Sequence, residues 1–281
     1  MLYLIHAKRN EYIHMSYEKD ERYKLSWSAL QRHELCRQKQ HLVSQGFSAP
    51  GKDVRNFLAG NVVDSVQKAW LENPSGSMVS LVDQHFEKAI AKAQEKDSIK
   101  WRNKNDKRTI FLQCQNAANQ LQPILEARVL PYDYEPGKWF YIPIKIQNPK
   151  TGQVEEIVLR GEFDLLVRDN DGNFIVWDLK TTANNDYWKS SLGQLVFYDL
   201  VILTMFGKPP VKCGFIQPLC DEQVKEFYFD NAHRAEMWGR INALMRDVWD
   251  GNFEPKVDNT GCSFCEVGHK CAKFQRKLSF S

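Results

Sequence analysis

Two strand-like segments joined by a turn carry the most informative chemistry in this sequence. Asp164 lies near the end of the first segment, and Asp178 and Lys180 end the second, after the Asp-Asn-Asp-Gly turn at 169–172. Side chains alternate along a strand, so Asp178 and Lys180 share a face, and the same rule places Glu162 beside Asp164. A hairpin therefore brings two or three carboxylates and one ammonium to a single point.

Such a cluster of oxygen ligands suits a hard divalent cation, Mg²⁺ or Mn²⁺. A bound cation makes water nucleophilic near neutral pH and neutralises charge that develops on a phosphate, and a nearby lysine can assist. The simpler alternative is an exposed strand on which Asp178 and Lys180 form an ordinary salt bridge. However, residues 174–177 are too apolar for an exposed strand, so charges at its end need partners or a catalytic task.

The residues around these charges form a known motif. Gly-Glu-Phe-Asp at 161–164, followed by Asp-Leu-Lys-Thr-Thr at 178–182, resembles the active site of PD-(D/E)XK nucleases. The resemblance is greatest to the RecB-like branch, which includes the CRISPR-associated adaptation nucleases and phage exonucleases. That branch carries Gln-x₃-Tyr on the following helix, matched here by Gln194 and Tyr198, which lie four residues apart on one helical face.

The resemblance implies a role for each motif residue. The implied metal ligands are Asp164, Asp178 and the main-chain carbonyl of Leu179. Lys180 is expected to serve the attacking water. Gln194 and Tyr198 are expected to orient the site or the DNA strand.

One position departs from the pattern of the branch, which usually has a histidine ligand on an early helix after a Gly-x₃ spacing. Here Gly60 is followed at that spacing by Asp64. Asp64 lies off the apolar stripe of Val62, Val66 and Trp70, and aspartate binds Mg²⁺ well. It is either a further metal ligand or a solvated helix residue, which leaves the number of metal ions open.

Four of the seven cysteines form a second constellation. Cys262-x₂-Cys265-x₅-Cys271 lies near the C-terminus, and Cys36 lies on the first helix. One early cysteine with this triplet resembles the iron–sulfur nucleases of the RecB-like branch and implies a [4Fe–4S] cluster that staples the first helix to the tail. Zinc, with His269 as a further ligand, is the alternative, although zinc ribbons normally supply two such cysteine pairs.

A basic stretch around Trp101 is a candidate DNA contact. Its residues are Lys100, Trp101, Arg102 and Lys104. Basic and aromatic side chains bind a single strand by phosphate pairing and base stacking, whereas a solvated charged face is the plainer interpretation. The net charge of +3 is too small to indicate nucleic-acid binding without such local clustering.

The order of predicted elements indicates an α/β fold. A capping box at Ser28 begins a helix to Ser44, and Asp53 caps a second helix. A helical insertion spans about 75–130. The remaining predictions are strands at 139–146, 155–168 and 174–181, a helix at 186–206, strands at 211–216 and 224–229, and a helix at 231–249 that Gly251 ends. This order, with the resemblance, predicts a restriction-endonuclease-like mixed sheet flanked by helices.

The chain is expected to form a single nuclease domain over 1–281. Within it we distinguish a helical part at 25–135 that holds the first cluster cysteine, a catalytic core at 136–230, and a C-terminal helix with the cluster segment at 231–281. No apolar run approaches the roughly 20 residues that span a bilayer. The composition and the absence of a secretory signal pattern predict a cytoplasmic protein without a membrane partner.

The expected reaction is phosphodiester hydrolysis by a DNA exonuclease that acts on single-stranded or end-containing DNA. It would serve DNA repair, recombination, phage or CRISPR-type processing, alone or with protein partners. Two alternatives remain. One is a structure-specific endonuclease with the same chemistry. The other is a non-catalytic DNA-binding subunit, although the lysine and both carboxylates of the motif are present.

Overall fold

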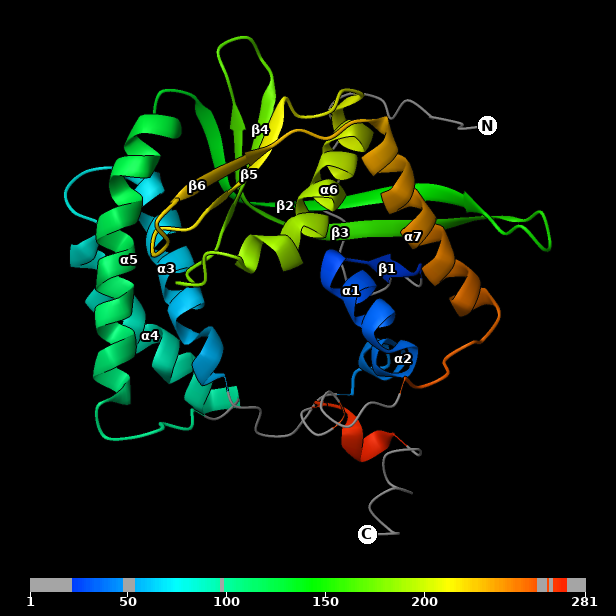
Figure 1. Ribbon diagram of the computed structural model, residues 1–281, viewed down its shortest axis with the longest axis horizontal. Helices are drawn as coiled ribbons and strands as arrows, with labels where there is room; N and C mark the ends of the chain where they lie inside the picture. The colour runs from blue at the N-terminus through cyan, green and yellow to red at the C-terminus, as the bar shows by residue number, and fades with distance from the viewer. Residues whose placement is uncertain (1–21, 48–53, 97–98, 257–261, 263–264, 272–281) are drawn as a thin grey trace.

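A mixed six-stranded β-sheet forms the centre of the part of the chain that the structure describes (Figure 1). The computed structural model describes residues 22–47, 54–96, 99–256, 262 and 265–271. The strands are β1 (Lys24–Leu25), β2 (Asp133–Gln147), β3 (Val154–Arg168), β4 (Phe174–Leu179), β5 (Lys212–Ile216) and β6 (Val224–Phe227). The sheet order is β1-β3-β4-β5-β6, with β2 paired along β3.

β3 organises the sheet. β2 pairs antiparallel along its whole length, β4 pairs antiparallel with its second half, and β1 pairs in parallel at Val158 and Leu159. β5 runs parallel to β4, and β6 is antiparallel to β5. A parallel neighbour requires a crossover connection, which α6 provides between β4 and β5. This connection is what brings the start of α6 to the end of β4.

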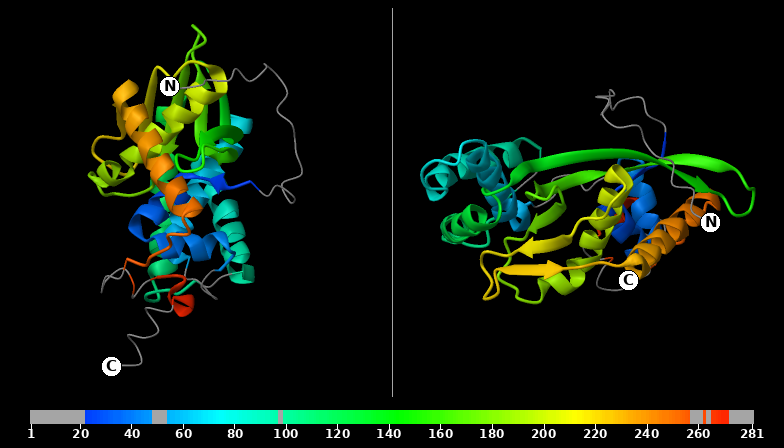
Figure 2. Two further views of the ribbon diagram at one scale, coloured as in Figure 1. Left: turned by 90° about the vertical axis from the view of Figure 1, so that its right-hand side faces the viewer. Right: turned by 90° about the horizontal axis from the view of Figure 1, so that it is seen from above.

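Two groups of helices cover opposite faces of the sheet (Figure 1, Figure 2). One face is covered by α1 (Trp27–Leu35), α6 (Tyr187–Phe206) and α7 (Asn231–Trp249), and the other by α3 (Arg55–Glu72), α4 (Val79–Lys96) and α5 (Asp106–Arg128). α2 (Arg37–Ser44) follows α1, and a short 3-10 helix lies at Gly268–Lys270. No described helix is both long and apolar enough to cross a lipid bilayer.

Close to Asp164, the alternation of side chains along the β3 strand shifts, so that residues two apart face different groups of helices. Phe163 packs with the α6 side, whereas Leu165, two residues later, packs with the α3 side. The ladder with β2 skips the position at which Gly137 faces Asp164. Strict alternation, which predicts that Glu162 and Asp164 share a face, is therefore wrong at this point, because the backbone of the hairpin is distorted there.

The first predicted helix differs from the observed one. It begins two residues earlier, with the Ser26 side chain accepting a hydrogen bond from the Ala29 N–H, so Ser28 is not the cap. It is also interrupted at Cys36, whose φ of −163° and ψ of 112° are extended, and α2 starts after it. β1 was not predicted, because a two-residue strand has no periodic pattern. Asp53, the predicted cap of the next helix, lies outside the described residues.

The other elements agree with the predictions within a few residues. β2 begins earlier than predicted, since it continues through Pro136 and Gly137, residues that normally indicate a turn. α4 and α5 occupy the predicted helical insertion, and their apolar faces pack on α3 and on the sheet. They therefore help to hold α3, which carries Asp64, against the end of β4.

Candidate active site

The end of β4 places one carboxylate in the interior. Ile175, Val176 and Trp177 are buried, and Asp178 continues this run with 0% of its surface exposed. Lys180 follows the strand, and its N–H donates to the Ile216 carbonyl of β5 at 2.9 Å. Its ammonium forms an ion pair with Asp178 Oδ2, whereas Asp178 Oδ1 has no hydrogen-bond partner among the described residues. The apolar strand therefore carries a charged pair to its end, as the motif predicts.

Asp164 lies beside this pair on β3. Its Oδ2 accepts a hydrogen bond of 2.8 Å from the Leu179 N–H, which fixes the carboxylate against the end of β4. Burial and the charge of Asp178 raise the pKa of Asp164 to about 8, although Lys180 and the Leu179 N–H favour the charged form. Burial likewise raises the pKa of Asp178, against the attraction of Lys180. Crowded carboxylates of this kind favour a bound cation.

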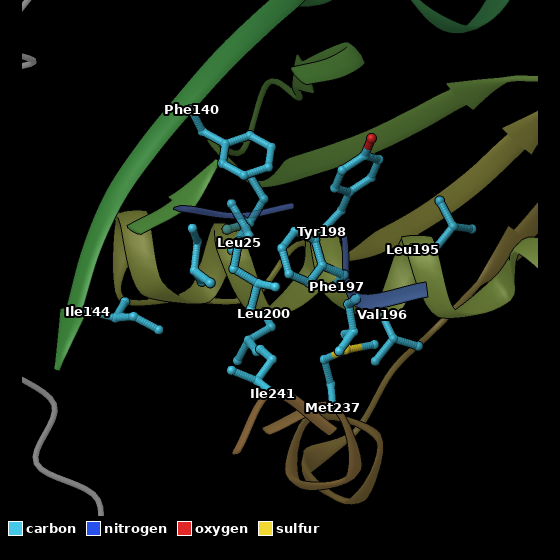
Figure 3. Packing of buried hydrophobic residues seen from close by; sticks show 14 of the residues in the cluster. Leu25, Phe140, Ile144, Leu195, Val196, Phe197, Tyr198, Leu200, Met237 and Ile241 are labelled. Carbon is cyan, nitrogen blue, oxygen red and sulfur yellow. The ribbon is translucent and has the colours of Figure 1, made fainter. Parts of the chain in front are cut away.

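A chain of hydrogen bonds links the lysine to α6. Lys180 Nζ donates to Gln194 Oε1 at 3.2 Å, and Gln194 Nε2 donates to the Tyr198 hydroxyl at 2.9 Å. The Tyr198 hydroxyl donates to the main-chain carbonyl of Glu162 at 2.9 Å. Figure 3 shows the Tyr198 ring beside Phe140, with its hydroxyl oxygen turned away from the apolar side chains. The predicted Gln-x₃-Tyr pair thus connects the lysine of β4 to the backbone of β3.

Burial, followed by the charges of Asp178 and Asp164, raises the pKa of Tyr198 well above its usual value, so the phenol stays protonated and remains a donor. For Lys180, burial disfavours the ammonium, but Asp178 and Asp164 outweigh it and raise its pKa. Both side chains therefore keep their protons at neutral pH. This makes them donors rather than general bases.

Asp64 approaches the same centre from α3. Helix and strand end are in close contact, since a Cβ on Gly60 would lie 3.3 Å from Thr181 Oγ1. Asp64 Oδ2 accepts a 2.8 Å hydrogen bond from Lys68, and Lys68 also donates to Glu162 Oε1 at 2.6 Å. Sequence analysis missed Lys68, although its four-residue spacing from Asp64 was a signal that the two could interact on one helical face.

The carboxylates suit a divalent cation by their chemistry. Asp64 Oδ1 is buried without a hydrogen-bond partner in the described part of the chain, and the charge of Asp64 raises the pKa of both Asp164 and Asp178. Even so, no three His, Cys, Asp or Glu side chains among the described residues are grouped closely enough to hold a metal ion. Lys180 instead pairs with Asp178, so the oxygen ligands fit a cation once this ion pair rearranges.

A model of the PD-(D/E)XK nuclease superfamily matches residues 24–272, which span every element that builds this site. The chain belongs to the PD-(D/E)XK nuclease superfamily. Membership implies a hydrolase that acts on nucleic acid, with DNA as the substrate. Asp178 and Lys180 have the D-x-K spacing and are the residues predicted to carry that part of the motif.

Two solved structures resemble this PD-(D/E)XK nuclease. One is described as SSO0001, with 15% identity, coverage of 91% of this chain and 88% of the other, and a TM-score of 0.42. The other, from Eubacterium rectale, is described as a candidate exonuclease, with 12% identity, coverage of 89% and 88%, and a TM-score of 0.49. No curated protein sequence matches the chain. At this level of similarity neither structure informs the reaction.

The four candidate cluster cysteines of the nuclease line one cavity. They come from the α1–α2 junction (Cys36) and from the C-terminal segment (Cys262, Cys265 and Cys271). Burial raises the pKa of the Cys265 thiol, and the neighbouring Cys36 and Cys262 raise it further, against Lys39 and a main-chain N–H. All four are free thiols, and no three of them are grouped closely enough for a metal ion within the residues described. The cavity brings the predicted ligands together without arranging them for coordination.

Polar contacts already hold the first helices to α7. Asp247 accepts from His33 at 3.0 Å and forms a 2.8 Å ion pair with Arg37. Arg240 makes a two-pronged contact with Glu34 at 2.6 and 2.7 Å. Contacts between protein groups therefore hold α1 and α2 against α7, in addition to any link that an iron–sulfur cluster would make.

The basic stretch is attached to the start of α3. Trp101 is partly buried against the core that α3, α4 and α5 form, so packing uses part of its ring. The Arg102 N–H donates to Asp106, which also binds Arg55, and the Arg102 side chain donates to Asn56 at 3.2 Å. Lys100 and Lys104 are exposed. The structure thus connects this stretch to the helix of Asp64 rather than to the carboxylates themselves.

Proposed function

We propose that the chain is a Mg²⁺- or Mn²⁺-dependent deoxyribonuclease of the RecB-like branch, acting as an exonuclease on single-stranded or end-containing DNA. One observation supports this best. The side chains of Asp178, Lys180, Gln194 and Tyr198 form a continuous polar chain at the end of β4. Gln194 and Tyr198 carry the sequence resemblance to the RecB-like branch, and this network gives them a physical task beside the catalytic lysine.

In this proposal Asp164, Asp178, Asp64 and the carbonyl of Leu179 hold the divalent cation. A bound cation activates water and neutralises negative charge on the phosphate. Asp164 is preorganised for this task by the Leu179 N–H. Asp64 contributes the unpartnered oxygen that a satisfied structural carboxylate would not leave buried.

Lys180 acts as a donor at Nζ. Because its pKa is raised, it stays charged and can orient water or stabilise negative charge on the phosphate, but it does not remove a proton. Gln194 accepts one of its hydrogen bonds and so restricts the direction of the remaining ones. Tyr198 holds Gln194 in turn, and ties it to β3 through the Glu162 carbonyl.

We also propose that Cys36, Cys262, Cys265 and Cys271 bind a [4Fe–4S] cluster. The support is that these four thiols, and no other cysteine, line one cavity in the described part of the chain. The break between α1 and α2 at Cys36 supports it too, because an extended residue can direct its side chain away from the helix. The cluster would tie the first helices to the C-terminal segment.

The activity test uses anaerobically purified protein with Mg²⁺ or Mn²⁺. The substrates are end-labelled linear single- and double-stranded DNA and covalently closed circles. The variants are Asp178→Ala and the matched control Asp83→Ala, which removes an exposed carboxylate of α4. Degradation of linear DNA alone, lost in Asp178→Ala and kept in Asp83→Ala, is the expected result. The order in which label is released shows the direction of degradation.

Two other results would change the proposal. Cleavage of closed circles by the wild type would identify an endonuclease that uses the same carboxylates. A folded wild type that binds DNA without cutting any substrate would identify a non-catalytic subunit. RNA of the same sequence as the single-stranded DNA separates a DNA preference from a general nuclease.

A further inference from the structure

Lys68 lies at the catalytic centre but belongs to no part of the motif. It extends from α3, one turn after Asp64, and its side chain is only 29% exposed. Its ammonium is 2.8 Å from Asp64 Oδ2 and 2.6 Å from Glu162 Oε1. The Lys68 ammonium, paired with one carboxylate from each element, therefore bridges α3 and β3.

The neighbouring strand is shaped to accommodate this bridge. Gly137 of β2 has a φ of +62°, a conformation that favours glycine. A Cβ at this position would lie 2.7 Å from Lys68 Cε and 2.8 Å from Glu162 Oε1. The same residue faces Asp164 at the skipped position of the β2–β3 ladder. Glycine at this position thus leaves the space that the Lys68–Glu162 ion pair occupies.

The two oxygens of Asp64 have different surroundings. Oδ2 is bound to Lys68, whereas Oδ1 is buried with no hydrogen-bond partner among the described residues. A carboxylate that offers one oxygen to each of two cations is the usual bridge in centres with two metal ions, which lie about 3.5–4 Å apart. Here the cation on the Oδ2 side is an ammonium, and Glu162 completes its carboxylate shell.

We propose that Lys68 occupies the second cation position of the centre, so that the enzyme binds one divalent ion where two would otherwise fit. This rests on the proposed function, because it assumes that Asp64, Asp164 and Asp178 hold the first ion. The fixed charge of Lys68 repels a second dication, and its hydrogen bonds occupy the oxygens of Asp64 and Glu162 that would bind one. Lys68 is therefore a positioning residue that sets the metal stoichiometry.

The test counts bound Mn²⁺ by electron paramagnetic resonance and equilibrium dialysis, without DNA and without turnover. The wild type is compared with Lys68→Met, which removes the charge, and with Lys68→Arg, which keeps it. One Mn²⁺ per chain is expected for the wild type and Lys68→Arg, and two for Lys68→Met. Two ions in the wild type, or one in a folded Lys68→Met, would overturn the proposal.

Lys68→Gln is measured in parallel in case Lys68→Met does not fold, and circular dichroism verifies folding. Asp178→Ala separates this inference from the proposed function. If Asp178→Ala abolishes Mn²⁺ binding while the Lys68 variants still bind one ion, the inference alone fails. If Asp178→Ala binds Mn²⁺ and cleaves DNA like the wild type, the proposed catalytic centre fails, whatever Lys68 does.

Discussion

The carboxylate centre and the cysteine cavity are built in different ways. Asp164 and Asp178 come from paired strands joined by a short turn, and the Leu179 N–H holds Asp164 in place. The four cysteines come from two segments that lie far apart in the sequence, the α1–α2 junction and the C-terminal segment, and they line one cavity. The sheet itself positions the carboxylates, whereas the cysteine site depends on how the α1–α2 junction meets the C-terminal segment.

This difference indicates what each site needs from its cofactor. The carboxylate centre is held by β3, β4, α3 and α6 through hydrogen bonds between protein groups. Among the described residues, the Lys39–Glu266 ion pair of 3.5 Å links the α1–α2 side of the cysteine cavity to the C-terminal segment. A metal ion is thus expected to add chemistry to the first site, and a cluster to add stability to the second.

The largest expected effect comes from removing the ammonium group of Lys180 from the carboxylate centre. Lys180→Met should lower kcat by about 10²–10³-fold, the usual loss when a donor directed at developing charge is deleted. Single-turnover cleavage of end-labelled DNA measures it. Lys189→Met is the matched control, because Lys189 pairs with Asp186 at the surface. Equal losses in both variants would show that Lys180 has only a general electrostatic effect.

Breaking the cysteine site should affect stability more than chemistry. Cys36→Ser is expected to lose iron and to melt on the order of 10 °C lower, since a metal-thiolate site contributes directly to folding. Its kcat below the melting range should match the wild type. Cys114→Ala, at a buried cysteine outside the cavity, should also melt lower but keep its iron. Full iron content in Cys36→Ser would rule out Cys36 as a ligand.

The carboxylate centre should also show a pH signature. Because the pKa of Asp164 is raised to about 8, the folded protein holds a proton there that the unfolded chain loses near pH 4. The bound proton thus stabilises the folded protein fully below pH 4. This stabilisation decreases above pH 4 and is lost as the pH rises through about 8. A bound cation removes the like-charge penalty, so stabilisation by Mg²⁺ should grow between pH 6 and 9.

Melting temperatures with Mg²⁺ and with a chelator, measured across that range, test this prediction. Asp164→Asn should remove most of the pH dependence in the chelated protein. A Mg²⁺ effect that is equally large at pH 6 and at pH 9 would contradict it.

The smallest effect is expected at the basic stretch. Lys104→Glu should weaken single-stranded DNA binding several-fold and reduce the salt slope by about one, without changing the pH profile of cleavage. Lys145→Glu on β2 makes the same charge change elsewhere on the surface and serves as the control. Fluorescence anisotropy at several salt concentrations measures both. Equal weakening in the two variants would show that the basic stretch is only a solvated charged face.

Much of the catalytic centre could be predicted because its residues lie in two short segments. An apolar run that ends in Asp-x-Lys, next to a turn and a second acidic strand, leaves few arrangements open. Gln194 and Tyr198 were identified by the resemblance to the RecB-like branch, and their four-residue spacing only places them on one helical face. The pairing of Glu162 with Asp164 was wrong because alternation assumes a regular strand, and Gly137 interrupts the ladder.

The fold was predictable to the same extent. Strands and helices with a clear period were found within a few residues, whereas the break at Cys36 left no local signal. The residues on both sides of Cys36 are helical in the structure, so local helix propensity gave no reason to end the first helix there.

The sequence alone therefore predicts that Asp178 and Lys180 lie together at the end of β4, because their two-residue spacing puts them on one side of a regular strand. The contact between Lys68 and Glu162 could not be read from it. Lys68 reaches Glu162 across 94 positions of chain, and Gly137 makes the room for that contact. Such long-range contacts depend on how α3 and the β2–β3 hairpin pack, and packing is a property of the folded chain as a whole.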